Sequence, residues 1–533
     1  MNLDEALLLL VPLAPLLLLG AMLIRSLRSA SMSTLPLAAV PALLGALILP
    51  GSVVEWDWML LGARWGLDSI GQRFLLFSAV LWLVAGWYAN AYIKSEAQRA
   101  SYALFHLLAM SGNFGLIIAE DSPSFFLFFA LMSFASYGLV IHNRDLSAMW
   151  AGKVYLALVV LGEVILLTAL LRWSVASEGV LLPGAGGQPD RWTAILFFIG
   201  FGIKAGVFPL HVWLPLAHPA APVPASALMS GVMIKAGLLG WIRFLPGSES
   251  SDATLWVNAL AGMGMATAFG GALLGCLQSN LKAVLAYSSI SQMGLMTAAV
   301  GLSFQPGGGA AALTAVTLFA AHHALCKGAL FLSVGLLAHP PKLPRWLFIA
   351  ALLVPALCLA GAPFTGGGLV KGLLKSLGPG WGSWKILLSL SSVGTTLLML
   401  RFFQLGRASR VDDGHAPAAR GLWGPWLVLV VMSALFPIWA STIQSTVPSS
   451  HWWSKIWPLI VGLGMYRLLL FRVPMDRPII APGDILSGVL VLLEGMLNML
   501  RAGSRFVGRL TILVRWRRRN GLRKASRMWR PMA

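Results

Sequence analysis

Residues 202–240 read GIKAGVFPLHVWLPLAHPAAPVPASALMSGVMIKAGLLG, and this stretch decides how the rest of the chain is interpreted. Lys204 and Lys235 lie near its two ends, each deep inside apolar sequence, and five prolines separate them. A charged side chain at the centre of a bilayer costs roughly 2.5–3.5 kcal/mol on insertion scales. Lysines in such positions therefore indicate an ion path through a membrane protein.

The composition agrees with a membrane protein. Of 533 residues, 58% are hydrophobic and only 11% are charged, with a mean hydropathy of +0.79. A soluble protein carries about 25% charged residues. Apolar runs of about 20 residues, enough to cross a bilayer as a helix, recur along the chain. We predict an all-α polytopic fold of about 14–16 transmembrane helices, with crossings near residues 6–24, 33–50, 74–93, 103–120, 123–141, 154–171, 192–217, 222–245, 254–276, 283–303, 311–337, 346–377, 384–404, 422–442 and 455–471.

Two of the predicted crossings contain their own interruptions. Residues 209–224 read PLHVWLPLAHPAAPVP, with Pro209 and Pro215 first, and residues 361–368 read GAPFTGGG, with Pro363 and Gly366. Proline removes a backbone donor and glycine weakens a helix. Paired discontinuous helices are the best sequence pointer to the ion path of a transporter. Lys204 precedes the first interruption and Lys371 follows the second, so we prefer transport to a simple packing kink.

A histidine and a lysine add to this polar set. His323 and Lys327 are four residues apart and share one face of a helix, and His322 lies beside them. Histidine can both accept and donate a proton near neutral pH. Taken singly, each residue could also be a structural hydrogen-bond donor to backbone freed at an interruption. Together they predict a polar axis for protons or small cations.

The three cysteines, Cys276, Cys326 and Cys358, all lie in apolar segments and form no CxxC pair. They predict no metal or iron–sulfur site and no disulfide. We therefore expect no cofactor in this chain and no bond-making chemistry of its own. Any redox chemistry is expected in a partner subunit.

The sequence resembles a known family through four motifs. Residues 202–240, LKAVLAYSSISQMG (281–294), HALCKGALFL (323–332) and GAPFTGGGLVK (361–371) are similar to the antiporter-like subunits of respiratory complex I. The same family includes Mrp-type sodium/proton antiporter subunits, hydrogenase and formate hydrogenlyase membrane subunits, and subunits of inorganic-carbon uptake complexes. The amino-acid sequence of the first motif is most similar to the hydrogenase-type branch. The resemblance covers about residues 65–405.

The resemblance implies an inverted-repeat core and a role for each buried cation. Lys204 is the lysine of the broken seventh helix, Lys235 that of the eighth, and Lys371 that of the broken twelfth. His323 and Lys327 form the pair of the eleventh helix. It also implies three parts of the chain: N-terminal helices one to four in 1–120, the proton-translocation core in 121–405, and C-terminal helices with a basic tail in 406–533.

The chain departs from the family pattern at two positions. The family usually has a glutamate in the fifth helix opposite the lysine of the seventh, where this sequence has Ala130. Glu163, in the next predicted helix, could replace it, or a neighbouring subunit could supply the carboxylate. Phe319 stands where many relatives have a further histidine.

Charge distribution predicts the orientation. Most of the net charge of +20 lies in loops that fall on one side of the predicted crossings, which places the N-terminus outside the cytoplasm. We do not interpret it as nucleic-acid binding. Residues 483–514 carry a polar stripe between basic ends and predict a helix along the cytoplasmic face, followed by a basic cytoplasmic tail. The alternative is a final crossing.

The leading hypothesis is a proton-conducting subunit of a complex-I-like respiratory or hydrogenase-type assembly in the cell (inner) membrane. Its partners would be other membrane subunits of an oxidoreductase complex such as an NADH:quinone oxidoreductase or a hydrogenase. The first alternative is a sodium/proton antiporter subunit. The second is an energy-coupling subunit for CO2 or bicarbonate uptake, which would bind a soluble catalytic subunit.

Overall fold

The computed structural model describes most of the chain, which divides into two compact units. The first unit is Met1–Pro482 and the second is Gly483–Ala533. The described residues are 3–49, 51–183, 187–248, 250–305, 309–338, 344–377, 383–408, 420–443, 452–483 and 485–486. The predicted amphipathic helix 483–514 lies almost entirely outside them.

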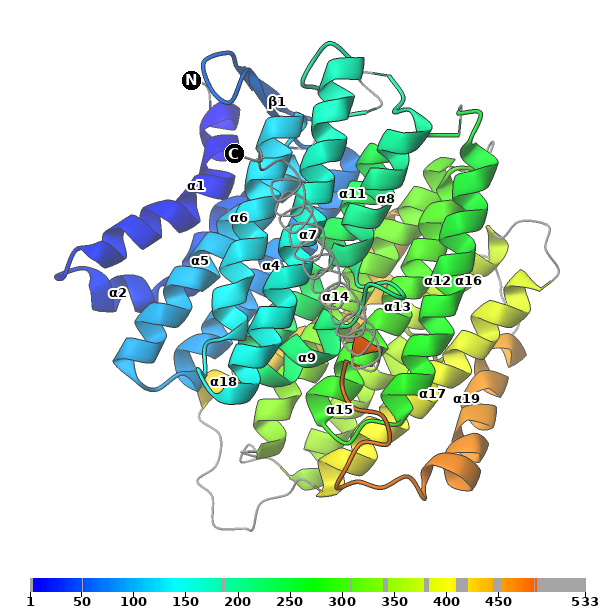
Figure 1. The fold of residues 1–533 in the computed structure, drawn as a ribbon. Coiled ribbons are helices and arrows are strands. Elements are labelled where there is room, and N and C mark those ends of the chain that lie inside the picture. The colour runs from blue at the N-terminus through cyan, green and yellow to red at the C-terminus, as the bar shows by residue number, and fades with distance from the viewer. Residues whose placement is uncertain are drawn as a thin grey trace, which may run out of the picture. The chain divides into compact units, whose positions relative to one another are not determined.

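The first unit is built from long helices that run side by side (Figure 1). The elements are α1 (Leu3–Leu23), α2 (Arg28–Ser33), η1 (Leu35–Ala39), α3 (Val40–Ile48), β1 (Val53–Trp56), β2 (Ala63–Gly66), α4 (Ser69–Tyr92), α5 (Glu96–Ile118), α6 (Ser122–Val140), α7 (Leu146–Ala176), α8 (Arg191–Ala205), α9 (Trp213–Ala220), α10 (Val223–Leu228), η2 (Met229–Met233), α11 (Lys235–Phe244), α12 (Ala253–Cys276), α13 (Leu281–Ser303), α14 (Gly309–Ala338), α15 (Arg345–Ala360), α16 (Gly366–Ser376), α17 (Trp384–Ala408), α18 (Arg420–Ile443), α19 (Trp453–Met465) and η3 (Tyr466–Leu470). Each predicted crossing corresponds to one helix or to short helices in succession. Within the described residues, eleven helical spans are long and apolar enough to cross a membrane. The predicted fold class is confirmed.

One small sheet was not predicted. Strands β1 and β2 pair antiparallel in the segment between α3 and α4, with Glu55 opposite Arg64. Arg64 forms ion pairs with Glu55 at 2.6 Å and with Glu120 at 3.0 Å. The hairpin therefore contacts the connection between α5 and α6.

Both broken helices end in the same backbone motif. α8 ends at Ala205 and is followed by Gly206 at φ +68°, and α15 ends at Ala360 and is followed by Gly361 at φ +86°. In each case the next amide bonds a carbonyl five residues back, from Val207 to Gly202 at 3.3 Å and from Ala362 to Leu357 at 3.1 Å. This is the Schellman arrangement, which favours glycine because its left-handed residue carries no Cβ penalty.

The prolines play different parts at these breaks. Pro209 and Pro363 lie in the two irregular connections, and Gly366 is the first residue of α16. Pro215, predicted as a break, instead lies in the first turn of α9. A proline is tolerated there because the amide it lacks has no partner within the helix.

The helices differ in how far they are covered by the rest of the chain. In α13 and in the segment Val223–Phe244, 100% and 94% of the residues in an apolar 18-residue stretch are buried inside the unit. In α1 and α18 the same share is only 28% and 33%. α13 and the α10–α11 segment therefore form the interior of the unit. Buried polar side chains gather on these inner helices and on α14.

Candidate functional site

Lys204 lies in the last turn of α8 and is almost fully buried. Its Nζ donates to Ser133 Oγ of α6 at 2.9 Å and lies 5.6 Å from the centre of the Phe129 ring. Ser133 is one helical turn after Ala130, so its hydroxyl lies on the same face of α6 as the position where the family usually has a glutamate. Ser133 was not predicted from the sequence, because the lysine's partner was expected to be a carboxylate.

Glu163 of α7 lines the same cavity as Lys204 and Ser133, with an empty volume of about 250 Å³. The Glu163 carboxylate is buried, and its Oε1 has no hydrogen-bond partner among the described residues. The described contacts include no direct ion pair between Glu163 and Lys204. Ser133 of α6 contacts the lysine instead, and Glu163 of α7 and Lys204 of α8 line the same cavity.

Lys235 and His323 are in direct contact at the centre of the unit. Lys235 Nζ lies 2.7 Å from His323 Nδ1, and both side chains are at most 1% exposed. Lys235 Nζ also donates to the Ser230 carbonyl at 2.7 Å. That carbonyl belongs to η2, a π-helical turn that precedes α11. π turns inside helices occur often at functional sites, and this one was not predicted.

Lys327 and α13 extend the same polar region. Lys327 Nζ donates to the Leu285 carbonyl of α13 at 2.9 Å. One turn along α13, Ser289 Oγ bonds Ser230 Oγ at 2.6 Å, which joins α13 to the π turn. These serines are fully buried. The motif LKAVLAYSSISQMG carries the signal for them, because its serines interrupt an otherwise apolar run.

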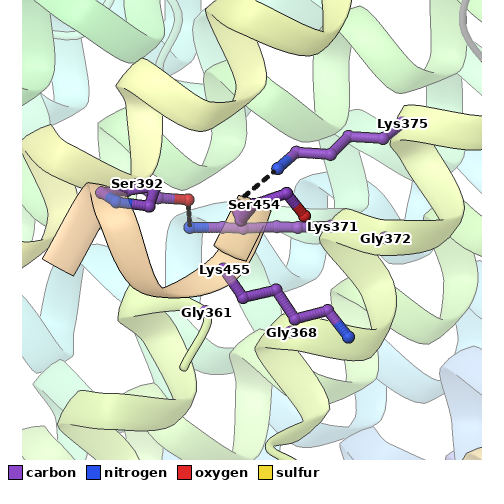
Figure 2. Close-up of a pocket in the computed structure, with 9 residues that line it drawn as sticks. Gly361, Gly368, Lys371, Gly372, Lys375, Ser392, Ser454 and Lys455 are labelled. Atoms are coloured by element: carbon purple, nitrogen blue, oxygen red, sulfur yellow. Dashed lines mark hydrogen bonds between the residues drawn. The ribbon is translucent and has the colours of Figure 1, made fainter. Parts of the chain in front are cut away.

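Lys371 occupies the second broken helix in a way that resembles Lys204 in the first. Its Nζ donates to the Leu359 carbonyl at the end of α15 and to Ser392 Oγ of α17, both at 3.1 Å. The break frees the Leu359 carbonyl from its helical partner. Figure 2 shows Lys371 reaching toward Ser392, with Lys375 and Lys455 lining the same pocket, whose empty volume is about 270 Å³.

The structure separates His322 from the other predicted residues. His322 Nε2 lies 3.5 Å from Cys326 Sγ, on a different face of α14 from the Lys235 contact, and its ring packs against Phe436. Cys358 of α15 joins this group. From their spacing, the cysteines were predicted to form no metal site and no disulfide, and the proximity of Cys326 and Cys358 was not foreseen. α14 and α15 are brought together by packing, which the spacing of the cysteines along the chain does not reveal.

Two discontinuous helices, each with a buried lysine bonded to a serine, and a buried lysine–histidine contact characterise this membrane protein. Residues 119–398 match the model of the family described as NADH:quinone oxidoreductase/Mrp antiporter, TM. The chain belongs to this family, and the resemblance inferred from its motifs is confirmed.

Relatives come from both branches that the sequence suggested. Hydrogenase-4 component B of Escherichia coli (strain K12) is 30% identical over 367 residues, which are 63% of this chain and 52% of that protein. The putative antiporter subunit mnhA2 of Staphylococcus saprophyticus is 30% identical over 336 residues, 57% of this chain and 42% of that protein. The chain thus matches about half the length of these curated relatives.

Two solved structures share the fold. The Mrp complex from Dietzia sp. DQ12-45-1b contains a chain that matches with a TM-score of 0.76 at 20% identity, over 94% of this chain and 60% of that one. The membrane-bound sulfane sulfur reductase, an archaeal respiratory membrane complex, contains a chain that matches with a TM-score of 0.68 at 21% identity, over 96% of each. These relatives are parts of membrane complexes.

Proposed function

We propose that this chain is a proton-conducting subunit of a multi-subunit membrane assembly. The single observation that carries the proposal is the contact between Lys235 Nζ and His323 Nδ1, 2.7 Å apart and sealed from solvent by the chain. An ammonium and a neutral imidazole at this distance can share one proton. A buried ionisable pair of this kind inside a membrane protein is typical of a proton path.

The geometry supports a relay through the imidazole ring. When Lys235 is protonated it donates to Nδ1, so the neutral ring carries its own proton on Nε2. His323 Nε2 has no hydrogen-bond partner among the described residues. A proton accepted at Nδ1 can therefore leave from Nε2 on the other side of the ring. Lys327, one turn along the same face of α14, is the next group in line.

The two lysines at the helix breaks, Lys204 and Lys371, would exchange protons at the two ends of the path. Lys204 shares its cavity with Glu163, a carboxylate that could pass protons to it through Ser133 or a bridging water. Lys371 opens onto the pocket of Lys375 and Lys455. The proposed path comprises Glu163, Lys204, Lys235, His323, Lys327 and Lys371, and it omits His322 because that ring faces the cysteines.

Sodium/proton exchange is the competing proposal, because several relatives are named as antiporter subunits. Sodium is a hard cation that is bound by oxygen ligands, as magnesium and calcium are. Among the described residues, Glu163 and Asp121 are the only buried carboxylates, and Asp121 caps the start of α6. The buried ionisable groups are mostly lysines and histidines, which favours protons.

The relatives also support membrane partners for this chain. We infer that it assembles with other membrane subunits, and that any redox or soluble catalytic centre lies in one of them. The proposed location is the cell (inner) membrane, with the N-terminus outside the cytoplasm. The inorganic-carbon alternative has no specific support in the geometry.

Removing the imidazole tests the proposal. In vesicles that contain the whole assembly, His323→Ala should lower proton translocation by about a hundredfold, the typical contribution of one positioned proton-transfer group. Lys94→Ala, at an exposed position between α4 and α5, is the matched control and should translocate normally. Normal proton translocation by a correctly assembled His323→Ala variant would contradict the proposal, and translocation that requires sodium would favour the antiporter.

A further inference from the structure

Three metal-ligating side chains converge beside the second helix break, on a different face of α14 from His323 and Lys327. His322 and Cys326 are four residues apart on α14 and therefore lie on one face of it, and Cys358 approaches from α15. Their ligand atoms, one imidazole nitrogen and two thiol sulfurs, all lie within 4.8 Å of one another. All three side chains are at most 2% exposed. From this convergence we propose that His322, Cys326 and Cys358 form a binding site for a zinc ion.

The distances suit a tetrahedral metal centre. Zinc binds sulfur at about 2.3 Å and nitrogen at about 2.0–2.1 Å, so two such ligands of one tetrahedral ion lie about 3.5 Å apart. The His322 Nε2 to Cys326 Sγ distance is 3.5 Å. The three ligand atoms lie up to 4.8 Å apart. To reach zinc-binding distances, Cys358 Sγ would have to move about 1 Å closer to the other two.

Charge decides between the candidate ions. Thiolate and imidazole ligands select zinc or monovalent copper over magnesium and calcium. An unbalanced charge is costly in a site with so little contact with water. Two thiolates and one neutral imidazole cancel the two positive charges of zinc, whereas the same ligands around monovalent copper leave a net negative charge. When zinc binds, the two thiols each release one proton to the solvent.

The backbone around the group is packed to hold it. A Cβ added at Gly366 would lie 2.6 Å from His322 Cδ2, and one added at Gly367 would lie 1.7 Å from the Cys358 carbonyl oxygen. Glycine at these two positions lets the start of α16 lie directly on the imidazole and on α15. Cys358 Sγ also donates to the Ser433 carbonyl of α18 at 3.6 Å, which offers an oxygen ligand for a fourth position. A bound zinc would thus tie α14 to α15 at the break.

Metal analysis of the full-length chain tests this proposal. The protein, with any subunits that co-purify, is produced in zinc-supplemented medium and dialysed against metal-free buffer. We expect about one zinc ion per chain, retained in Cys276→Ser and lost in Cys326→Ser and Cys358→Ser. Cys276 is the matched control, because it is also a buried cysteine but lies outside the group. Zinc at less than about a tenth of an ion per chain, or equal zinc in all variants, would overturn the proposal.

Two measurements on the unmodified chain keep the test independent of variant folding. Cobalt(II) added to metal-free protein should give a thiolate-to-cobalt charge-transfer absorption that zinc abolishes, and the absence of this absorption contradicts the site. Thiol titration of the denatured metal-free chain should find all three cysteines free. Two missing thiols that return on reduction would show a Cys326–Cys358 disulfide and overturn the zinc site.

Discussion

At the scale of single residues, the partner of Lys204 is the most informative departure from the family pattern. A serine and a carboxylate from two different helices take up the space opposite the lysine. Ser133 accepts a hydrogen bond from Lys204 Nζ, and Glu163 lines the same cavity. A buried carboxylate without a full set of hydrogen bonds is costly. We infer that Glu163 is retained for proton exchange with Lys204.

Replacing Glu163 by glutamine tests that inference. Glu163→Gln keeps the size of the side chain and removes the proton-binding group, so proton translocation should fall by about tenfold or more while the assembly remains intact. Glu96→Gln, an exposed glutamate at the start of α5, should have no effect. Full translocation in Glu163→Gln would show that the carboxylate for Lys204 comes from elsewhere.

At the scale of elements, the contact between α8 and α11 places Lys204 and Lys235 on neighbouring helices. A Cβ at Gly237 would lie 2.5 Å from the Phe201 carbonyl oxygen and 2.6 Å from the Ala205 amide nitrogen. The helices therefore touch through their backbones, two residues after Lys235 and one residue after Lys204.

We expect Gly237→Ala to force these helices apart and to destabilise the protein by about 1–3 kcal/mol, the usual cost of overpacking. Gly262→Ala in α12 is the control, because nothing lies within 4 Å of its added Cβ. That change should be neutral or stabilising by up to about 1 kcal/mol, since alanine favours a helix. Unfolding of the two purified variants in detergent measures the difference. Equal stability would mean that the α8–α11 contact is looser than described.

The elements also show what the sequence could predict. Hydropathy located the crossings because each needs a long apolar run, and the glycines and prolines located the two breaks. The hairpin β1–β2 was missed because its strands are only four residues long. The π turn was missed because its residues, Met229–Met233, read as ordinary helix. Lys235 and His323 were predicted to share an axis, but their contact depends on how α11 and α14 pack, which hydropathy does not encode.

At the scale of the whole molecule, the charged loops predict which end of each helix faces the cytoplasm. The hairpin is joined to the connection between α5 and α6 by Arg64 and Glu120. The start of α4, just after the hairpin, is joined to the end of α11 by the pair Asp68–Arg243 at 3.2 Å. These connections therefore lie at one end of the helices. The charge distribution predicts that this end faces outward.

Topology reporters check this orientation. A reporter inserted in the hairpin near Asp57 should map outside the cytoplasm, and one inserted near Lys94 should map inside. A reporter at the C-terminus should also map inside, if residues 483–514 lie along the cytoplasmic face as predicted. An outside C-terminal reporter would show that this segment crosses the membrane.

The central claim is that protons move along the buried lysines, and Lys204 tests it most directly. The measurement is proton translocation in vesicles with verified levels of the assembled complex, comparing the unmodified chain with Lys204→Ala and Lys204→Arg. Both variants should be inactive, because alanine binds no proton and arginine does not release the one it holds. Normal proton translocation by Lys204→Ala would contradict the account.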